Sequence, residues 1–266
     1  MEAYRVEMGI NGTYWERLGR TLGGLLKGDL GLSYRSRTPV LNELLVRFKV
    51  TFNISAWSIV LGIILGIFFG IISALKQNTL WDSLSTGCAL FGISMPMFWQ
   101  GLMLILVFSV WLGWLPASGY VPFSEDPLQN LRTLLLPASV LGTGLAATLM
   151  RHTRASMIAV LKADYIRTAR AKGLLPKAVI LKHAFRNALV PVITLTTLLF
   201  GELLGGAVLT EQVFTIPGFG KMIVDSVFNR DYAVVQGVVL IVAIGFLMLN
   251  LLADVLYVLI NPKMRG

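Results

Sequence analysis

Long apolar runs, separated by shorter polar stretches, dominate the chain. A helix that crosses a bilayer needs about 20 mostly apolar residues, because hydrocarbon offers no partner for an unpaired backbone group and a helix satisfies its own. The pattern therefore predicts an all-α, polytopic helical membrane protein with five transmembrane helices. The five windows run from about Phe52 to Leu75, Gly87 to Leu112, Leu134 to Met150, Leu189 to Val213 and Val234 to Ile260.

A polar region between the third and fourth windows predicts a helical hairpin. Good helix formers extend to Lys172, Gly173 suits the left-handed residue that ends a helix, and Pro176 suits the first turn of the next helix. We expect a first helix, a break at Gly173 and a second helix.

Composition supports a membrane protein and excludes other classes. Hydrophobic residues make up 55% of the 266 residues and charged residues 14%, whereas a soluble domain carries roughly 25% charged residues. So much apolar area excludes a disordered chain. The single cysteine, Cys88, excludes a disulfide-stapled secreted domain.

The net charge of +9 is concentrated in the predicted hairpin. Residues 151–187 carry nine basic side chains and one acidic side chain, Asp164. Basic loops beside apolar spans stay on the cytoplasmic side of a bilayer. We therefore place the hairpin inside the cell and attribute the charge to membrane topology, with no nucleic-acid partner.

The N-terminal segment then lies outside, although its eight basic and five acidic side chains give residues 1–50 a charge of +3. It is either an external N-terminus held by partner contacts or the start of a chain that lacks a first spanning helix, and we expect the second. Residues 40–49 are expected along the membrane interface. The predicted organisation is an external segment (1–50), a transmembrane domain (51–260) with a cytoplasmic hairpin at 151–190, and a cytoplasmic tail (261–266).

The first helix of the hairpin is a candidate docking element. Helical spacing places Tyr165, Ala169 and Lys172 on one side, and positively charged side chains surround that side. Such a helix could lodge in a groove of a soluble partner, with Ala169 permitting close approach. It could equally be a solvated basic loop on anionic lipid headgroups. The surrounding basic residues are Lys162, Arg167 and Arg170.

Two features inside the spans are candidates for a translocation path. Ser94, Met95 and Pro96 interrupt the second window, and a proline beside methionine can give a kink with an adaptable surface, or ordinary helix packing. Glu202 in the fourth window could attract an ammonium group or bond a neighbouring helix.

Neither a metal site nor a catalytic site is expected. The only histidines, His152 and His183, have no cysteine or carboxylate at ligand spacing. No Gly-Lys-Ser/Thr phosphate loop or nucleophile motif occurs. An ion-coupled secondary transporter is the alternative from the residues alone, with Glu202 and Asp254 as its intramembrane acids.

Several motifs resemble the permease subunits of binding-protein-dependent ABC importers, in the dipeptide, oligopeptide and nickel branch. The general Glu-Ala-Ala…Gly signature is divergent here, since Arg167-Thr168-Ala169 stands in place of the triplet, but Gly173 matches. The more specific matches are Gly28-Asp-Leu-Gly31, Ser94-Met-Pro-Met-Phe-Trp99, Trp114-Leu-Pro-Ala-Ser-Gly119, Asp164-Tyr-Ile-Arg-Thr-Ala-Arg-Ala-Lys-Gly173, His183-Ala-Phe-Arg-Asn187-Ala-Leu-Val-Pro191, Gly201-Glu-Leu-Leu-Gly-Gly-Ala207, Glu211-Gln-Val-Phe-Thr-Ile-Pro-Gly-Phe-Gly220, Asn229-Arg-Asp-Tyr232 and Asn250-Leu-Leu-Ala-Asp254.

The resemblance implies a type I ABC importer permease fold with six spans in the family, of which this chain would hold the last five. It implies a multi-pass protein of the prokaryotic plasma (inner) membrane that imports di- or oligopeptides, or alternatively nickel or glutathione. The partners would be a second homologous permease, two ABC ATPase subunits that bind ATP and Mg on the cytoplasmic side, and an external binding protein. The ATPase-coupling residues would be Asp164, Tyr165, Arg167, Thr168, Ala169, Arg170, Lys172 and Gly173.

Overall fold

The computed structural model describes residues 12–260, apart from the side chains of 204–206, 254 and 256–260. The first eleven residues, the predicted tail at 261–266 and the Asp254 side chain lie outside this description. The described chain is helical, with one isolated bridge between Leu32 and Pro39, which confirms the all-α prediction. The elements are α2 (Tyr14–Leu26), α3 (Val40–Leu75), α4 (Leu80–Ser94), α5 (Met97–Leu104), η1 (Ile105–Trp111), α6 (Pro127–Leu161), α7 (Asp164–Ala171), α8 (Pro176–Ala178), η2 (Val179–Phe185), α9 (Arg186–Gly206), α10 (Val208–Val213), α11 (Phe219–Phe228) and α12 (Tyr232–Ile260).

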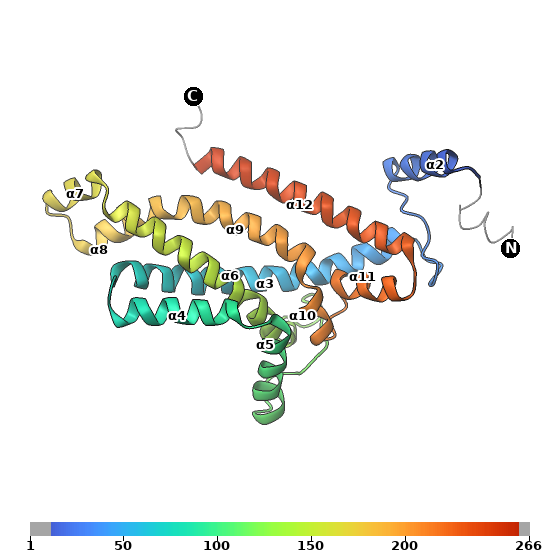
Figure 1. The fold of residues 1–266 in the computed structure, drawn as a ribbon, viewed down its shortest axis with the longest axis horizontal. Helices are drawn as coiled ribbons and strands as arrows, with labels where there is room; N and C mark the ends of the chain where they lie inside the picture. The colour runs from blue at the N-terminus through green and yellow to red at the C-terminus, as the bar shows by residue number, and fades with distance from the viewer. Residues whose placement is uncertain (1–11, 261–266) are drawn as a thin grey trace.

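The described helices provide five candidate membrane spans. Helix α3, helix α6, the continuous α8–η2–α9 segment and helix α12 are each long and apolar enough to cross a bilayer, and α4 with α5 and η1 forms a bent fifth candidate. Figure 1 shows the long helices running side by side. The five expected windows therefore each overlap one of these candidates, although the fourth window extends beyond its candidate into α10.

Helix boundaries extend beyond the predicted windows, because backbone hydrogen bonding within a helix continues whatever the polarity of its side chains. Helix α3 begins at Val40, so residues 40–49 continue the first span. Helix α6 runs on to Leu161 and includes the first part of the predicted hairpin. The fourth window covers two helices, since α9 ends at Gly206 and α10 begins at Val208.

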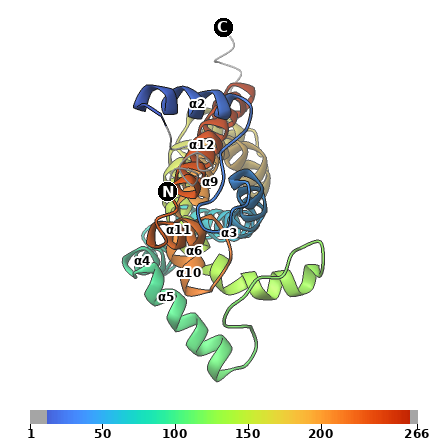
Figure 2. The same cartoon turned by 90° about the vertical axis from the view of Figure 1, so that its right-hand side faces the viewer.

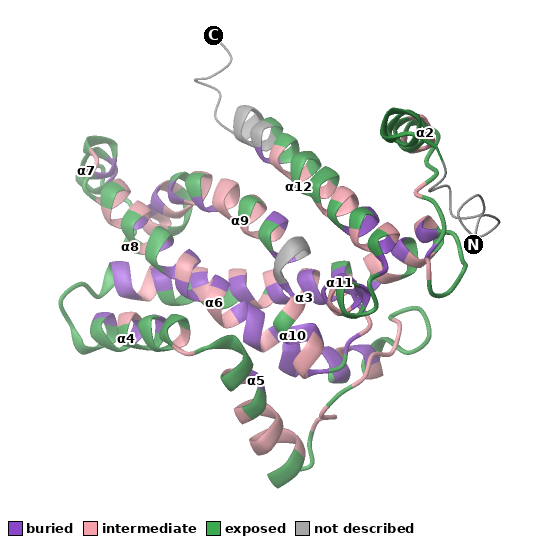
Figure 3. Ribbon diagram, turned by 45° about the vertical axis from the view of Figure 1, so that its right-hand side comes forward, coloured by how far each residue is buried: buried purple, intermediate pink, exposed green. Residues whose placement is uncertain are grey.

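The α3–α6 pair forms the buried centre of the bundle (Figure 3). Gly62, Gly66 and Gly70 recur every fourth residue on α3 and face α6. A Cβ added to Gly66 would lie 2.9 Å from the backbone oxygen of Ala146, and one added to Gly70 would lie 2.9 Å from that of Met150. Small residues at this spacing let membrane helices approach closely, so the contact depends on these three glycines.

The predicted kink in the second span is confirmed, because α4 and the α5–η1 segment meet at 103°. Pro96 has no N–H to continue the hydrogen bonding of α4, and the helix ends at Ser94. The Gln100 side-chain amide donates to the carbonyl oxygens of Gly92 at 2.7 Å and Met95 at 3.3 Å, which gives the end of α4 replacement partners.

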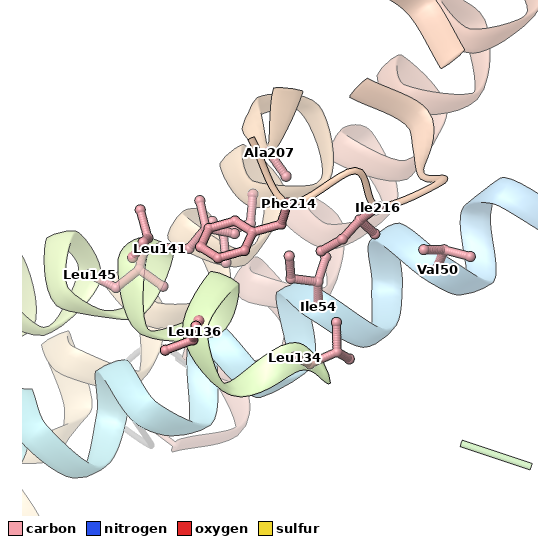
Figure 4. Packing of buried hydrophobic residues seen from close by; sticks show 11 residues of the cluster. Val50, Ile54, Leu134, Leu136, Leu141, Leu145, Ala207, Phe214 and Ile216 are labelled. Carbon is pink, nitrogen blue, oxygen red and sulfur yellow. The ribbon is translucent and has the colours of Figure 1, made fainter. Parts of the chain in front are cut away.

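An apolar cluster fixes α10 and the segment after it against the bundle. Figure 4 shows Phe214 and Ile216 packed between Ile54 on α3 and Leu141 on α6. Phe214 is 1% exposed and Ile216 is fully buried. Burying side chains of this size contributes about 1.5–3 kcal/mol each, so this connection is anchored rather than loose.

The two ends of the bundle carry different elements. Figure 1 places α7 and α8 at one end, and α2, α11 and the start of α12 at the other; Figure 2 shows α2 and α5 projecting from different sides. At the second end Asp231 accepts hydrogen bonds from the Ser33 hydroxyl at 2.5 Å and from the Tyr34 and Arg35 amides at 3.1 and 3.3 Å. The N-terminal loop is thereby tied to the start of α12.

Candidate functional site: the α7 hairpin and a cavity beside α9

The predicted break between the two hairpin helices is present as a defined helix stop. Gly173 has a φ of 75°, its N–H donates to the Arg170 carbonyl at 3.0 Å, and the Leu174 N–H donates to the Ala169 carbonyl at 3.4 Å. This is the Schellman arrangement that closes a helix on a left-handed residue. Pro176 then opens the next helix at its first position. The expected sequence of helix, break and helix is confirmed.

One face of α7 is seated on the bundle. Ile166 is fully buried and Ala169 is 8% exposed. They pack in one apolar cluster with Ala74 of α3, Met157 of α6 and Val179 of η2. Because eight residues alone do not form a stable helix in water, this contact is what fixes α7 in place.

The opposite face of α7 is exposed and polar. Arg167 lies 3.5 Å from the Asp164 carboxylate, with both side chains largely in solvent. The Asn187 side-chain amide donates to the Tyr165 hydroxyl at 3.2 Å and to the His183 carbonyl at 2.8 Å, so Tyr165 is held against the second helix. The other exposed residues of the predicted set are Thr168, Arg170, Lys172 and Gly173.

The structure separates three residues that helical spacing placed on one side. Tyr165 and Lys172 are exposed, whereas Ala169 faces the bundle. The reason is Ile166, the larger apolar side chain, which lies three residues before Ala169 and turns it into the core. Close approach of a partner to Ala169 was therefore a wrong expectation.

An ion pair between Asp82 and Arg154 stabilises the end of the bundle that carries α7. The Asp82 carboxylate at the start of α4 accepts hydrogen bonds from Arg154 of α6 at 2.9 Å (Nε) and 2.8 Å (Nη2). It also accepts from the Ser73 hydroxyl of α3 and from the Asn78 N–H at 3.1 Å. Three helices are thus joined through one carboxylate, whose partners Ser73 and Arg154 lie one residue before Ala74 and three before Met157 of the α7 seat.

Of the four predicted pathway residues, two meet at one cavity. Glu202 on α9 and Met95 at the α4–α5 bend line a cavity of about 390 Å³ together with residues of α6. Ser94 and Pro96 are exposed but do not line it. Arg151 of α6 also lines this cavity. We did not predict this role from the sequence, because we assigned the charge of Arg151 to the cytoplasmic hairpin.

Sequence reasoning also missed a buried carboxylate, Glu211 of α10. Its Oε1 accepts from the Thr51 hydroxyl at 2.8 Å and its Oε2 from the Lys221 N–H at 2.9 Å. A Cβ at Gly218 would lie 2.2 Å from Oε1, so that glycine makes room for the carboxylate. Burial raises the pKa of the Glu211 carboxyl, while the hydrogen bonds from Lys221 and Thr51 oppose that rise. The Glu211…Pro-Gly-Phe-Gly220 motif is thus a structural unit.

Replacing Glu211 by leucine is expected to destabilise the protein by about 3 kcal/mol, because it leaves the Thr51 hydroxyl and the Lys221 N–H without their acceptor. Thermal unfolding of the purified protein in detergent measures this change. The matched control is Glu211→Gln, which keeps an acceptor oxygen and should lose less stability than the leucine variant. Equal melting temperatures for the leucine variant and the unaltered protein would contradict this role.

No group of three or more His, Cys, Asp or Glu side chains gathers at metal-binding distance within the described part of the chain. The arrangement that remains is a bundle of spanning helices, basic and exposed at one end and hollowed beside α9. It defines the class as a multi-pass helical membrane protein.

Solved structures share this fold. The inward-facing conformations of the MetNI methionine ABC transporter match with a TM-score of 0.66 at 15% identity, covering 82% of this chain and 96% of that chain. An amino acid ABC transporter with histidines matches with a TM-score of 0.55 over 91% of this chain and 97% of that chain, again at 15% identity. The fold is therefore that of type I ABC importer permeases.

Sequence relatives are closer. The dipeptide transport system permease protein DppB of Escherichia coli (strain K12) is 41% identical over 97% of this chain and 83% of its own length. The glutathione transport system permease protein GsiC of Escherichia coli O6:H1 is 44% identical, and a putative peptide transport system permease protein of Brucella abortus (strain 2308) is 40% identical, each over 100% of this chain and 84% of the relative.

The family model for the binding-protein-dependent transport system inner membrane component matches residues 66–266, and the chain belongs to this family. It is the permease subunit of an ABC importer in the plasma membrane. Membership implies ATPase and substrate-binding partners, and the permease subunits of this family are not themselves catalytic.

Proposed function

We propose that this chain pairs with a second homologous permease to form the membrane pathway of an ATP-driven importer of di- or oligopeptides. The names of these relatives support the substrate class, since they concern dipeptides, peptides and glutathione, which is itself a small peptide. Glutathione or nickel is the alternative substrate within the same branch.

The exposed basic face of a firmly seated α7 is the observation that carries the proposed mechanism. Arg167, Arg170 and Lys172 are exposed around it, and arginine forms strong, directional hydrogen bonds with carboxylates of a protein partner. Each permease receives one of two ATPase subunits on this face. ATP and Mg are bound by those subunits, since the 266 residues contain no Gly-Lys-Ser/Thr loop; this chain carries no cofactor and no ATP-hydrolysis site.

Movement of the ATPase subunits reaches the spans through the seat of α7. Ile166 contacts the same apolar cluster as Ala74 of α3 and Met157 of α6, and Asp82 ties both helices to α4. ATP binding closes the ATPase pair and shifts the permease from inward-facing to outward-facing, while the external binding protein delivers the ligand.

Reconstitution tests this function. Proteoliposomes that contain the chain, its second permease, the ATPase subunits and the external binding protein should take up radiolabelled dipeptide only when ATP is supplied. Uptake of nickel in place of peptide would contradict the substrate class. Uptake by this chain alone, driven by a proton or sodium gradient, would contradict the importer mechanism.

Substituting valine for Gly173 is expected to reduce uptake by about tenfold, because a β-branched residue strains the left-handed backbone by roughly 1–2 kcal/mol and shifts the turn that holds α7. A Cβ at this position has no atom within 4 Å, so the effect comes from the backbone alone. Gly173→Asn is the matched control, since asparagine tolerates this conformation. Equal uptake by the valine and asparagine variants would contradict the role of the turn.

A further inference from the structure

The cavity beside α9 has one acidic and one basic side chain on its wall. Glu202 of α9 and Arg151 of α6 both line it, and the rest of the wall is mostly apolar, with Gln100 and Thr148 as further polar groups. Its volume is about 390 Å³, within the range of roughly 300–1,000 Å³ typical of small-molecule sites. Apolar walls with a few convergent polar groups are characteristic of ligand pockets.

Both charged side chains are exposed, and neither has a hydrogen bond or ion pair with any side chain or backbone group that the structure describes. Arg151 lies ten residues before the end of α6, and Glu202 lies four residues before the end of α9. Charged groups within membrane spans face protein or water rather than lipid. The surface around Glu202 and Arg151 therefore faces a protein partner, an aqueous path or a ligand.

The wall of the cavity is long enough for a short peptide. Leu145 and Arg151 of α6 both line it, as does Glu202 of α9, and Arg151 lies six residues after Leu145. Six helical residues rise about 9 Å. An extended peptide covers about 3.3–3.6 Å per residue, so two or three residues fit along this stretch of α6.

A second cavity, between α3, α4, α5 and α6, does not offer this chemistry. It has a similar volume of about 360 Å³, but none of its lining residues is charged. It has no group that would orient a zwitterion, whereas the cavity beside α9 has one charge of each sign.

We propose that the cavity beside α9 is a peptide-binding site within the permease, in which Glu202 binds the α-ammonium group and Arg151 binds the α-carboxylate of a di- or tripeptide. This inference rests on the proposed peptide-import function and adds a site of recognition within the membrane. The apolar wall and Met95 accommodate differing side chains, because methionine adapts its shape to its neighbours.

Binding to the permease–ATPase complex in nanodiscs, without the external binding protein, tests the site. The ligands are radiolabelled alanyl-alanine, its N-acetyl derivative and its C-terminal amide. The unaltered complex should bind alanyl-alanine about tenfold more tightly than either derivative, since each derivative loses one hydrogen bond between charged groups.

Each substitution should remove one preference and leave the other. Glu202→Gln should bind the free and N-acetylated peptides equally while still favouring the free peptide over the amide, and Arg151→Gln should show the reverse. Arg132→Gln, an exposed arginine on the same helix, is the matched control and should keep both preferences.

Either of two results would contradict the proposed peptide-binding site. Either the unaltered complex shows no preference for free termini, or each substitution weakens all three ligands alike, as expected if Glu202 and Arg151 pair with the second permease instead. ATP-driven uptake by the complete importer separates this outcome from the proposed function. Dipeptide uptake without terminus-dependent binding contradicts only the site, whereas absence of peptide uptake contradicts the function and the site together.

Discussion

Replacing Ile166 by aspartate is expected to abolish uptake while the spanning helices stay folded. Ile166 is fully buried in the seat of α7, and an unpaired carboxylate there costs several kcal/mol. An eight-residue helix has no stability of its own to offset this cost, so α7 detaches. Because each 1.4 kcal/mol is a factor of about ten, transport should fall by at least about a hundredfold.

Uptake into proteoliposomes and hydrogen exchange at residues 164–173 measure this effect together. Exchange should rise at α7 and stay low in the core of α3 and α6. Ile166→Leu conserves volume and should transport at close to the normal rate. Full transport by the aspartate variant, or global unfolding with no selective loss of α7, would contradict the idea that this seat positions the helix.

The second large loss of stability and uptake is expected when the ion pair between Asp82 and Arg154 is broken. Asp82→Asn leaves the Arg154 guanidinium, which is one-third exposed, without its charged partner. Removing one member of a buried pair costs about 3–5 kcal/mol, and partial exposure of Arg154 places the expected loss near the lower end, about 3 kcal/mol. Thermal unfolding in detergent measures it, and uptake should fall with it because α4 is no longer tied to α6.

Comparing this variant with the double substitution Asp82→Asn/Arg154→Met separates the ion pair from its surroundings. Since the double variant leaves no uncompensated charge, its loss of stability should be smaller than the sum of the two single losses. Strict additivity of the two single effects would show that Asp82 and Arg154 act independently, against the geometry of their two hydrogen bonds.

The hairpin and the kink were predictable because each depends on local backbone chemistry. Gly173 and Pro176 carry conformational preferences that act within a few residues, and Pro96 removes a backbone donor wherever it stands. The spans were predictable because hydropathy reflects the solvent around a helix. None of these predictions required information about which helices contact one another.

Features that depend on which helices meet were not predictable in the same way. The orientation of Ala169 follows from the cluster that Ile166 enters, and one of the hydrogen-bond donors to Glu211 is Thr51, 160 residues away. Arg151 joins Glu202 because α6 extends beyond its apolar window. The stripe of Gly62, Gly66 and Gly70 did carry a sequence signal, since its four-residue period is typical of close helix contacts.

Site-specific photocross-linking from α7 tests the central claim most directly, namely that this helix receives the ATPase subunit. Cys88 is the only cysteine, so Cys88→Ser provides a cysteine-free background in which Thr168→Cys carries a photoreactive maleimide. Ser118→Cys, exposed in the connection between η1 and α6, is the matched control. In the assembled, ATP-hydrolysing importer we expect an adduct with the ATPase subunit from position 168 and none from position 118. An ATPase adduct from position 118, or none from position 168, would contradict the claim.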